Sequence, residues 1–167
     1  AEALYAAASV DPALEIVGID CHIGSQIASA DPLLEALHNL LELVDRLNGS
    51  GIRLRHVDLG GGLGVRYQDE PEFDLKTYGA ALRSALGSRD LRLILEPGRY
   101  LVANGGLLLT RVEYLKPARD GGRSFAIVDA AMNDLIRPAL YQAWHGIEPV
   151  TTPGENALGG RWDVVGP

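Results

Sequence analysis

The sequence predicts an α/β fold: the last part of a parallel β/α barrel that runs into the start of a β-rich domain. Three short apolar runs suited to strands are separated by two helical patterns with one apolar face each, which is the arrangement of βαβ units. Beyond residue 99 the long helical patterns stop and strand-like segments follow. We therefore expect two domains, a partial barrel at residues 1–104 and the beginning of a β-rich domain at residues 105–167.

The first expected strand, residues 16–19, is followed by a long amphipathic helix. Asp31 is expected to cap that helix, with Pro32 at its first helical position, and Asn48-Gly49 to end it. Apolar side chains recur at spacings of three and four residues, which predicts one buried stripe. That stripe consists of Leu33, Leu37, Leu40, Val44 and Leu47.

The second unit has a strand at residues 54–59 and a helix capped by Asp74 and ended by Gly87. The inner face of this helix is expected to carry Leu75, Tyr78, Leu82 and Leu86. A third strand is expected at residues 91–95. Residues 101–116 and 125–129 predict strands of the β-rich domain.

Composition excludes several classes of function. A net charge of -7 argues against a nucleic-acid surface, and the lack of a long apolar run argues against a membrane span. Cys21 is the sole cysteine, so an internal disulfide is excluded and a reducing, cytoplasmic location is expected. No signal-peptide pattern opens the chain. The only methionine is Met132, and residues 163–167 suit a strand that stops early, so a piece of a longer chain is expected.

Unusual residues follow all three barrel strands. They are His22-Ile23-Gly24-Ser25-Gln26, then Gly60-Gly61-Gly62-Leu63-Gly64, then Glu96-Pro97-Gly98-Arg99. The carboxyl ends of parallel barrel strands face the active site, so these segments predict one. The glycines match neither a dinucleotide fingerprint nor a P-loop, because Val65, Tyr67 and the lack of a following lysine break both patterns. They indicate either a bare backbone that binds an anion or a tight turn.

Each candidate side chain has two interpretations. His22 either lies flat against an aromatic ring or is satisfied by the backbone. Glu96 either pairs with Arg99 or faces a cationic ring nitrogen, which leaves Arg99 free for an anion. Arg137 and Tyr141, on a turn followed by a short helix, suit a substrate carboxylate or form a solvated surface pair. Cys21 is interpreted as a small buried hydrophobe, and no metal site is expected.

Four stretches together resemble the fold-type III pyridoxal-phosphate (PLP) decarboxylases, whose barrel is of the alanine-racemase-like (β/α)8 type. They are GIDCHIGSQ (18–26), HVDLGGGLGVRY (56–67), EPGRY (96–100) and VDAAMNDLIRPALY (128–141). The last is similar to members that act on diaminopimelate. The resemblance implies decarboxylation of meso-2,6-diaminopimelate to L-lysine and CO₂ in lysine biosynthesis, by a homodimer with active sites at its interface.

The same resemblance implies roles for matching residues. His22 would stack on the pyridine ring of pyridoxal 5'-phosphate, and Glu96 would pair with the ring nitrogen. The phosphate would be held by Ser25, Gly60, Gly61 and Gly62, helped by the turn at Pro97 and Gly98. Arg99 would also belong to the cofactor site. The distal amino-carboxylate end of the substrate would be bound by Arg99, Arg137 and Tyr141.

Two departures from the family pattern concern catalysis. The family's Schiff-base lysine lies upstream of these motifs, and neither Lys76 nor Lys116 has its context. The catalytic cysteine of the family's C-terminal motif is also missing. The chain by itself is therefore expected to hold no catalytic residue and to be inactive. Two alternatives stay open: a fold-type III decarboxylase acting on ornithine, arginine or carboxynorspermidine, and a non-enzymatic PLP-binding barrel protein.

Overall fold

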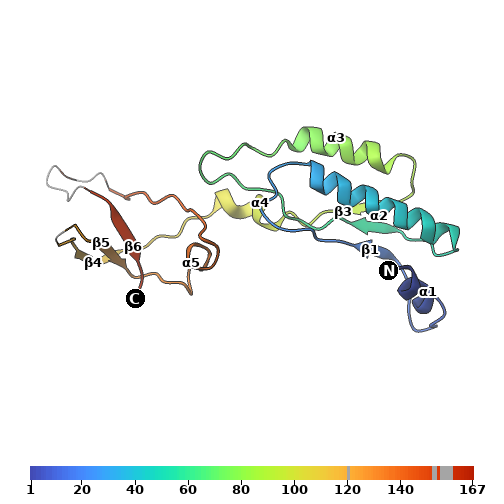
Figure 1. Cartoon of the computed structure of the whole chain (residues 1–167), viewed down its shortest axis with the longest axis horizontal. Coiled ribbons are helices and arrows are strands. Elements are labelled where there is room, and N and C mark those ends of the chain that lie inside the picture. The colour runs from blue at the N-terminus through green and yellow to red at the C-terminus, as the bar shows by residue number, and fades with distance from the viewer. Residues whose placement is uncertain (120, 152–153, 155–159) are drawn as a thin grey trace. The chain divides into compact units, whose positions relative to one another are not determined.

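The computed structural model describes residues 1–119, 121–151, 154 and 160–167 (Figure 1). The chain forms two compact units, Ala1–Gly106 and Leu107–Pro167. The first unit contains α1 (Glu2–Ser9), β1 (Gly18–Asp20), α2 (Asp31–Gly49), β2 (His56–Asp58), α3 (Leu75–Leu86), β3 (Arg92–Ile94), α4 (Gly98–Val102) and the 3₁₀ helix η1 (Ala103–Gly105). The second contains β4 (Val112–Lys116), β5 (Ser124–Val128), α5 (Arg137–Tyr141) and β6 (Trp162–Val165).

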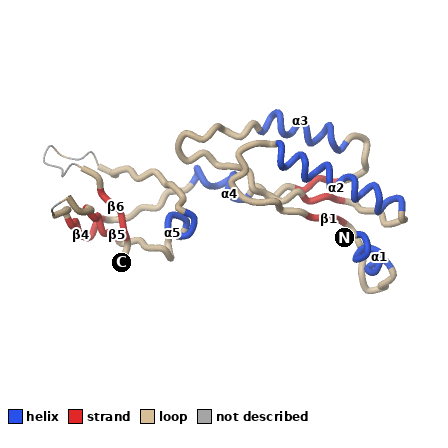
Figure 2. Tube along the Cα trace, in the orientation of Figure 1, coloured by secondary structure: helices blue, strands red, loops and turns tan. Residues whose placement is uncertain are grey.

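Strands β1, β2 and β3 form a parallel sheet in that order. Gly18 is in register with His56, and His56 with Arg92. Strands and helices alternate along this unit (Figure 2), which confirms the predicted α/β pattern, although each strand is shorter than expected. Because the strands are parallel, the loops that follow them leave the sheet at the same edge.

Helix α2 supplies more residues to the core of the first unit than any other helix or strand. Its buried stripe is Leu33, Leu37, Leu41, Val44 and Leu47. The prediction of Leu40 was wrong by one position: Leu41 lies four residues after Leu37 and three before Val44, which keeps the stripe on one face, whereas Leu40 is only partly buried. Asp31 is the first helical residue rather than the cap, which is Ala30.

Helix α3 is capped as predicted. The Asp74 carboxylate accepts a hydrogen bond from the Thr77 backbone N–H at 3.0 Å, and Gly87 ends the helix with a φ of 58°. Leu75 was wrongly predicted to face inward and is 47% exposed. The inward place is taken by Phe73, which precedes the cap and meets the Tyr78 ring edge-on at 5.3 Å. This contact spans the N-terminus of the helix as a hydrophobic staple.

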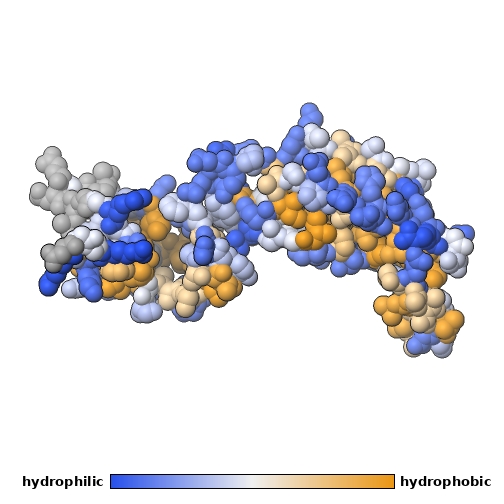
Figure 3. Space-filling model, in the orientation of Figure 1, coloured by the Kyte–Doolittle hydropathy of each residue, from blue (hydrophilic) through white to orange (hydrophobic). Residues whose placement is uncertain are grey.

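Helices α2 and α3 contact each other, and their inner faces pack on the core residues of the sheet. The core of the first unit includes Val57 and Leu59, both almost fully buried. Helix α1 has no buried residue and packs on the core through Tyr5. Apolar side chains are exposed over α1 and the turn after it (Figure 3), namely Leu4, Val10 and Leu14.

The second unit is a sheet of order β4-β5-β6, antiparallel between β4 and β5 and parallel between β5 and β6. The prediction of one strand over residues 101–116 was wrong in its first part, where α4 and η1 form. Tyr100 explains the helix, because it packs against Phe73 at 6.5 Å while the Leu101 N–H donates to the Pro97 carbonyl. Among the described residues no helix has both the length and the apolar character required to cross a membrane.

Candidate active site

The segments that follow β1, β2 and β3 meet at one edge of the sheet. Backbone hydrogen bonds extend beyond the strands: the Cys21 N–H donates to the Asp58 carbonyl at 3.0 Å, and the Glu96 N–H to the Gly60 carbonyl at 2.8 Å. Residues of the three segments line a cavity of about 180 Å³. It is lined by His22, Ser25, Gly62, Leu63, Glu96, Pro97, Gly98, Arg99 and Tyr100. The structure therefore brings the three predicted segments of the first unit together.

The glycines let neighbouring backbone approach closely. A Cβ atom at Gly61 would lie 2.1 Å from the Glu96 carbonyl oxygen, and one at Gly62 would lie 2.2 Å from the Gly24 carbonyl oxygen. Gly60 and Gly62 also have φ values of 65° and 94°, which disfavour other residues. Glycine is therefore required at these positions because the three loops pack closely. This reason adds to the tight turn and the anion site that the sequence indicated.

The glycine N–H groups differ in their availability. Gly60 donates to the Asp58 carboxylate at 2.9 Å, and Gly61 donates to His22 Nδ1 at 3.3 Å. The N–H of Gly62, a residue that lines the cavity, has no acceptor in the part of the chain that the structure describes. Because His22 Nδ1 accepts a hydrogen bond, the neutral imidazole carries its proton on Nε2. Gly62 is therefore the glycine whose backbone is open to an anion.

Arg99 does not pair with Glu96. Its guanidinium donates from Nη1 to the Gln26 side-chain oxygen at 2.6 Å and to the Tyr67 hydroxyl at 3.3 Å, and from Nη2 to Ser25 Oγ. The Glu96 carboxylate is exposed and has no hydrogen bond or ion pair with any described residue. The residues that line the cavity consequently include both a cation and a carboxylate without a partner among the described residues.

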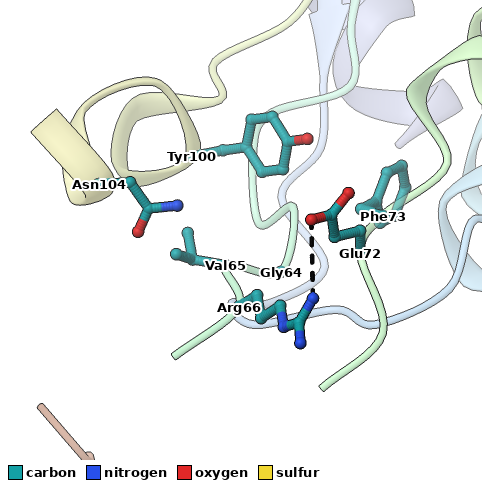
Figure 4. Close-up of a pocket in the computed structure, with 7 residues that line it drawn as sticks. All are labelled: Gly64, Val65, Arg66, Glu72, Phe73, Tyr100 and Asn104. Atoms are coloured by element: carbon teal, nitrogen blue, oxygen red, sulfur yellow. Dashed lines mark ion pairs between the residues drawn. The ribbon is translucent and has the colours of Figure 1, made fainter. Parts of the chain in front are cut away.

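Tyr100 also lines a second cavity of about 300 Å³ (Figure 4). Its other lining residues are Gly64, Val65, Arg66, Glu72, Phe73 and Asn104. Arg66 and Glu72 form an ion pair across it at 3.7 Å. Tyr100, Tyr67 and Gln26 were not among the site residues predicted from sequence, although all three lie within or next to the predicted motifs. Only their positions near strand ends could have indicated them.

Cys21 has the environment of an unreactive thiol. Burial raises its pKa, and the negative charges of Asp20 and Asp58 raise it further. A protonated thiol is a poor nucleophile. Among the described residues no cluster of three or more histidine, cysteine or acidic side chains could hold a metal ion.

Arg137 and Tyr141 lie in the second unit, at the first and last residues of α5. Pro138 occupies the first turn, so the expected turn followed by a short helix is confirmed. The Arg137 guanidinium lies 5.5 Å from the centre of the Tyr141 ring. Arg137 Nε is buried without a hydrogen-bond partner among the described residues, an arrangement that costs free energy until an acceptor arrives.

Known proteins resemble this chain along its whole length. Residues 1–103 match the family described as "Pyridoxal-dependent decarboxylase, pyridoxal binding domain". Diaminopimelate decarboxylase of Pseudomonas aeruginosa is 58% identical over 167 residues, which are 100% of this chain and 39% of that protein. The enzyme of that name from Neisseria meningitidis serogroup B is 53% identical over 163 residues, which are 98% of this chain and 38% of that protein.

Solved structures give the same picture. Diaminopimelate decarboxylase from Helicobacter pylori, complexed with L-lysine, superposes with a TM-score of 0.86 at 42% identity, covering 99% of this chain and 41% of that one. A lysine/ornithine decarboxylase from Vibrio vulnificus, complexed with cadaverine, has a TM-score of 0.76 at 22% identity, covering 92% of this chain and 41% of that one. The latter likeness concerns the fold alone. The chain spans about two fifths of the length of these relatives.

Proposed function

The chain belongs to the family of pyridoxal-dependent decarboxylases, and from that premise we propose that the protein containing it converts meso-2,6-diaminopimelate to L-lysine and CO₂. The observation that carries the proposal is the cavity in which His22, Glu96 and Arg99 meet. Relatives at 50–58% identity that bear the name diaminopimelate decarboxylase support this substrate. L-Lysine in the Helicobacter pylori structure is the product that the proposed reaction would release.

The residues at the cavity fit pyridoxal 5'-phosphate. This cofactor, when bound, accepts the electrons left behind when CO₂ departs. Glu96 offers an unpaired carboxylate that would hold a proton on the ring nitrogen, and His22 offers a flat imidazole that would lie against the ring. Both groups line the same cavity, so one small molecule could contact the two of them.

The phosphate would be bound by Ser25 Oγ and the free N–H of Gly62. Gly60 and Gly61, whose N–H groups already have acceptors, would contribute a surface without side chains. Pro97 and Gly98 would close the other side, since the Gly98 N–H donates to the Glu96 carbonyl at 2.8 Å and holds the turn tight.

Substrate choice would depend on the second carboxylate of diaminopimelate, which ornithine lacks. Arg99, Arg137 and Tyr141 would bind this distal amino-carboxylate end, because a guanidinium recognises a carboxylate with two parallel hydrogen bonds. The buried, unpaired Nε of Arg137 supports an anionic partner for that residue. A site built for such a group discriminates against substrates that lack it, since its polar groups then stay unpaired.

We further infer that β1, β2 and β3 are part of an alanine-racemase-like (β/α)8 barrel, with a partial barrel at residues 1–104 and the start of a β-rich domain at 105–167. The parallel strand order and the division of the chain after Gly106 support this. A homodimer with interfacial active sites and a cytoplasmic location complete the proposal.

The test is an assay of the full-length protein, loaded with pyridoxal 5'-phosphate, for CO₂ release from meso-diaminopimelate, ornithine, arginine and carboxynorspermidine. We expect turnover of diaminopimelate alone. Release of CO₂ from ornithine but not from diaminopimelate would replace the proposed substrate. Cofactor binding with no CO₂ from any of the four would favour a non-enzymatic pyridoxal-phosphate protein.

A further inference from the structure

Gln26 adopts a backbone conformation that its residue type disfavours. Its φ is 60°, in the left-handed region, and only Gln142 shares this property among the described non-glycine residues. For a residue with a side chain this conformation costs free energy and persists where surrounding contacts hold it. The contacts that hold Gln26 in this conformation therefore indicate the role of its side chain.

The side-chain amide of Gln26 pairs with the backbone of Val65 through two hydrogen bonds. Nε2 donates to the Val65 carbonyl at 2.5 Å, and Oε1 accepts from the Val65 N–H at 3.2 Å. Next to this pair, the Ile27 N–H donates to the Gly62 carbonyl at 2.8 Å, and the Gly64 N–H donates to the Ile27 carbonyl at 2.9 Å. The loop after β1 is thereby joined to the glycine segment after β2 as if by a short strand pairing.

The same Gln26 oxygen connects a third loop. Oε1 accepts from Arg99 Nη1 at 2.6 Å, while Arg99 Nη2 donates to the neighbouring Ser25 hydroxyl oxygen. This network allows one orientation of the amide, because a flipped amide would set its NH₂ group against two other donors. Gln26 does not line the cavity, yet it contacts the Arg99 guanidinium that does.

We propose that Gln26 is a positioning residue that sets the places of Ser25 and Arg99 at the cavity; the proposal rests on the function proposed above. Without the Gln26 oxygen, the guanidinium loses one of its acceptors. The Glu96 carboxylate, three positions earlier in the chain and without a partner, is then the strongest competing acceptor. Arg99 would turn toward Glu96. The guanidinium would then leave Ser25, and the Glu96 carboxylate would no longer be free for the ring nitrogen.

Gln26→Met in the full-length protein tests this, because methionine has a similar length and no amide. The KM for meso-diaminopimelate should rise about 10-fold, the expected effect of misplacing one charged hydrogen-bond donor, and kcat should fall as well, because Glu96 would then be paired with Arg99. The dissociation constant of pyridoxal 5'-phosphate should rise as well, through Ser25. The Val65 amide hydrogen should exchange faster with solvent, because Gln26 Oε1 is its acceptor.

Gln26→Glu keeps the oxygen that faces Arg99 but sets its second carboxylate oxygen against the Val65 carbonyl, so the protein should be less stable while KM stays within about 3-fold of the parent value. Gln68→Met is the matched control, since the Gln68 side chain makes no hydrogen bond with the described residues, and all readouts should stay unchanged. If Gln26→Met lowers only the melting temperature and leaves KM and cofactor affinity unchanged, Gln26 is structural and the proposal fails. The amide exchange and cofactor measurements remain decisive if the parent protein proves inactive on diaminopimelate, which would refute the proposed substrate alone.

Discussion

The Glu96 backbone N–H donates to the Gly60 carbonyl oxygen at 2.8 Å, which ties the loop after β3 to the glycine segment after β2. The bond continues the pattern of the sheet, in which Leu59 donates to Ile94 at 3.1 Å. Backbone contacts thus hold Glu96 in place while its carboxylate stays exposed and unpaired among the described residues. A carboxylate held in this way is ready for a cationic group that enters the cavity.

Glu96→Gln in the full-length protein should lower kcat at least about 100-fold, because a neutral amide cannot keep a ring nitrogen protonated. Cofactor affinity should fall much less, since the amide still forms a hydrogen bond. Steady-state kinetics and a cofactor titration check the two effects separately. A near-normal kcat would refute the proposed role of the carboxylate.

Gly61→Ala should damage the site through backbone displacement. The added methyl group would lie 2.1 Å from the Glu96 carbonyl oxygen, so one of the two loops must move. We expect destabilisation of about 1–3 kcal/mol and weaker cofactor binding, measured by thermal unfolding and titration. Gly79→Ala in α3 is the control: no atom lies within 4 Å of its added Cβ, and alanine should stabilise the helix by up to about 1 kcal/mol. Equal effects of the two substitutions would contradict the close packing.

Local patterns predicted the positions of the elements better than their detailed packing. Asp74 and Gly87 mark the ends of α3 because capping and left-handed termination depend on a few neighbouring atoms. Leu75 and Leu40 were misplaced because a stripe of leucines has more members than a helix can bury on one face. Phe73 is buried in place of Leu75 because it packs against Tyr78, and this tertiary contact cannot be read from the helical pattern.

For the candidate site, too, positions along the chain could be predicted but side-chain contacts could not. Its three segments could be predicted from strand ends, because parallel topology alone brings the loops to one edge. The pairing of Arg99 with Gln26 could not, because it depends on the direction in which α4 leaves the sheet. The helical conformation of Gly98–Val102 was itself missed, since an apolar run after a proline suits a strand equally well.

Leu82→Ala and Leu75→Ala form a matched pair within α3. Leu82 is 5% exposed, so its truncation should cost about 2–5 kcal/mol of unfolding free energy. Leu75 is 47% exposed, and its truncation should cost less than about 1 kcal/mol. Urea-induced unfolding of both variants measures the difference. Similar losses in the two variants would mean that Leu75 is buried after all.

Arg137→Ala should raise the KM for diaminopimelate at least about 10-fold while the cofactor still binds normally. The reason is the proposed pairing of the guanidinium with the distal carboxylate of the substrate. Arg111→Ala serves as the control in the same unit, because Arg111 is exposed and pairs with Glu113 at 2.7 Å. An unchanged KM in the Arg137 variant would remove this residue from the substrate site.

We expect ionisation of Tyr78 to lower the stability of the folded protein at high pH. Burial, with a smaller effect of Cys21, raises the pKa of its phenol to about 12, whereas an unfolded tyrosine ionises near pH 10. The folded state therefore favours the protonated phenol, and its stabilising effect is complete below about pH 10 and lost as pH rises toward 12. Over this window Tyr78 should contribute a fall of up to about 2 kcal/mol in unfolding free energy.

Tyr78→Phe tests this, because it keeps the ring that packs on Phe73 and removes the ionisable group. When both proteins are unfolded in urea at pH 9, 10, 11 and 12, the unfolding free energy of the variant should fall less steeply with pH. Parallel slopes for the two proteins would mean that the Tyr78 phenol ionises as readily in the folded as in the unfolded state.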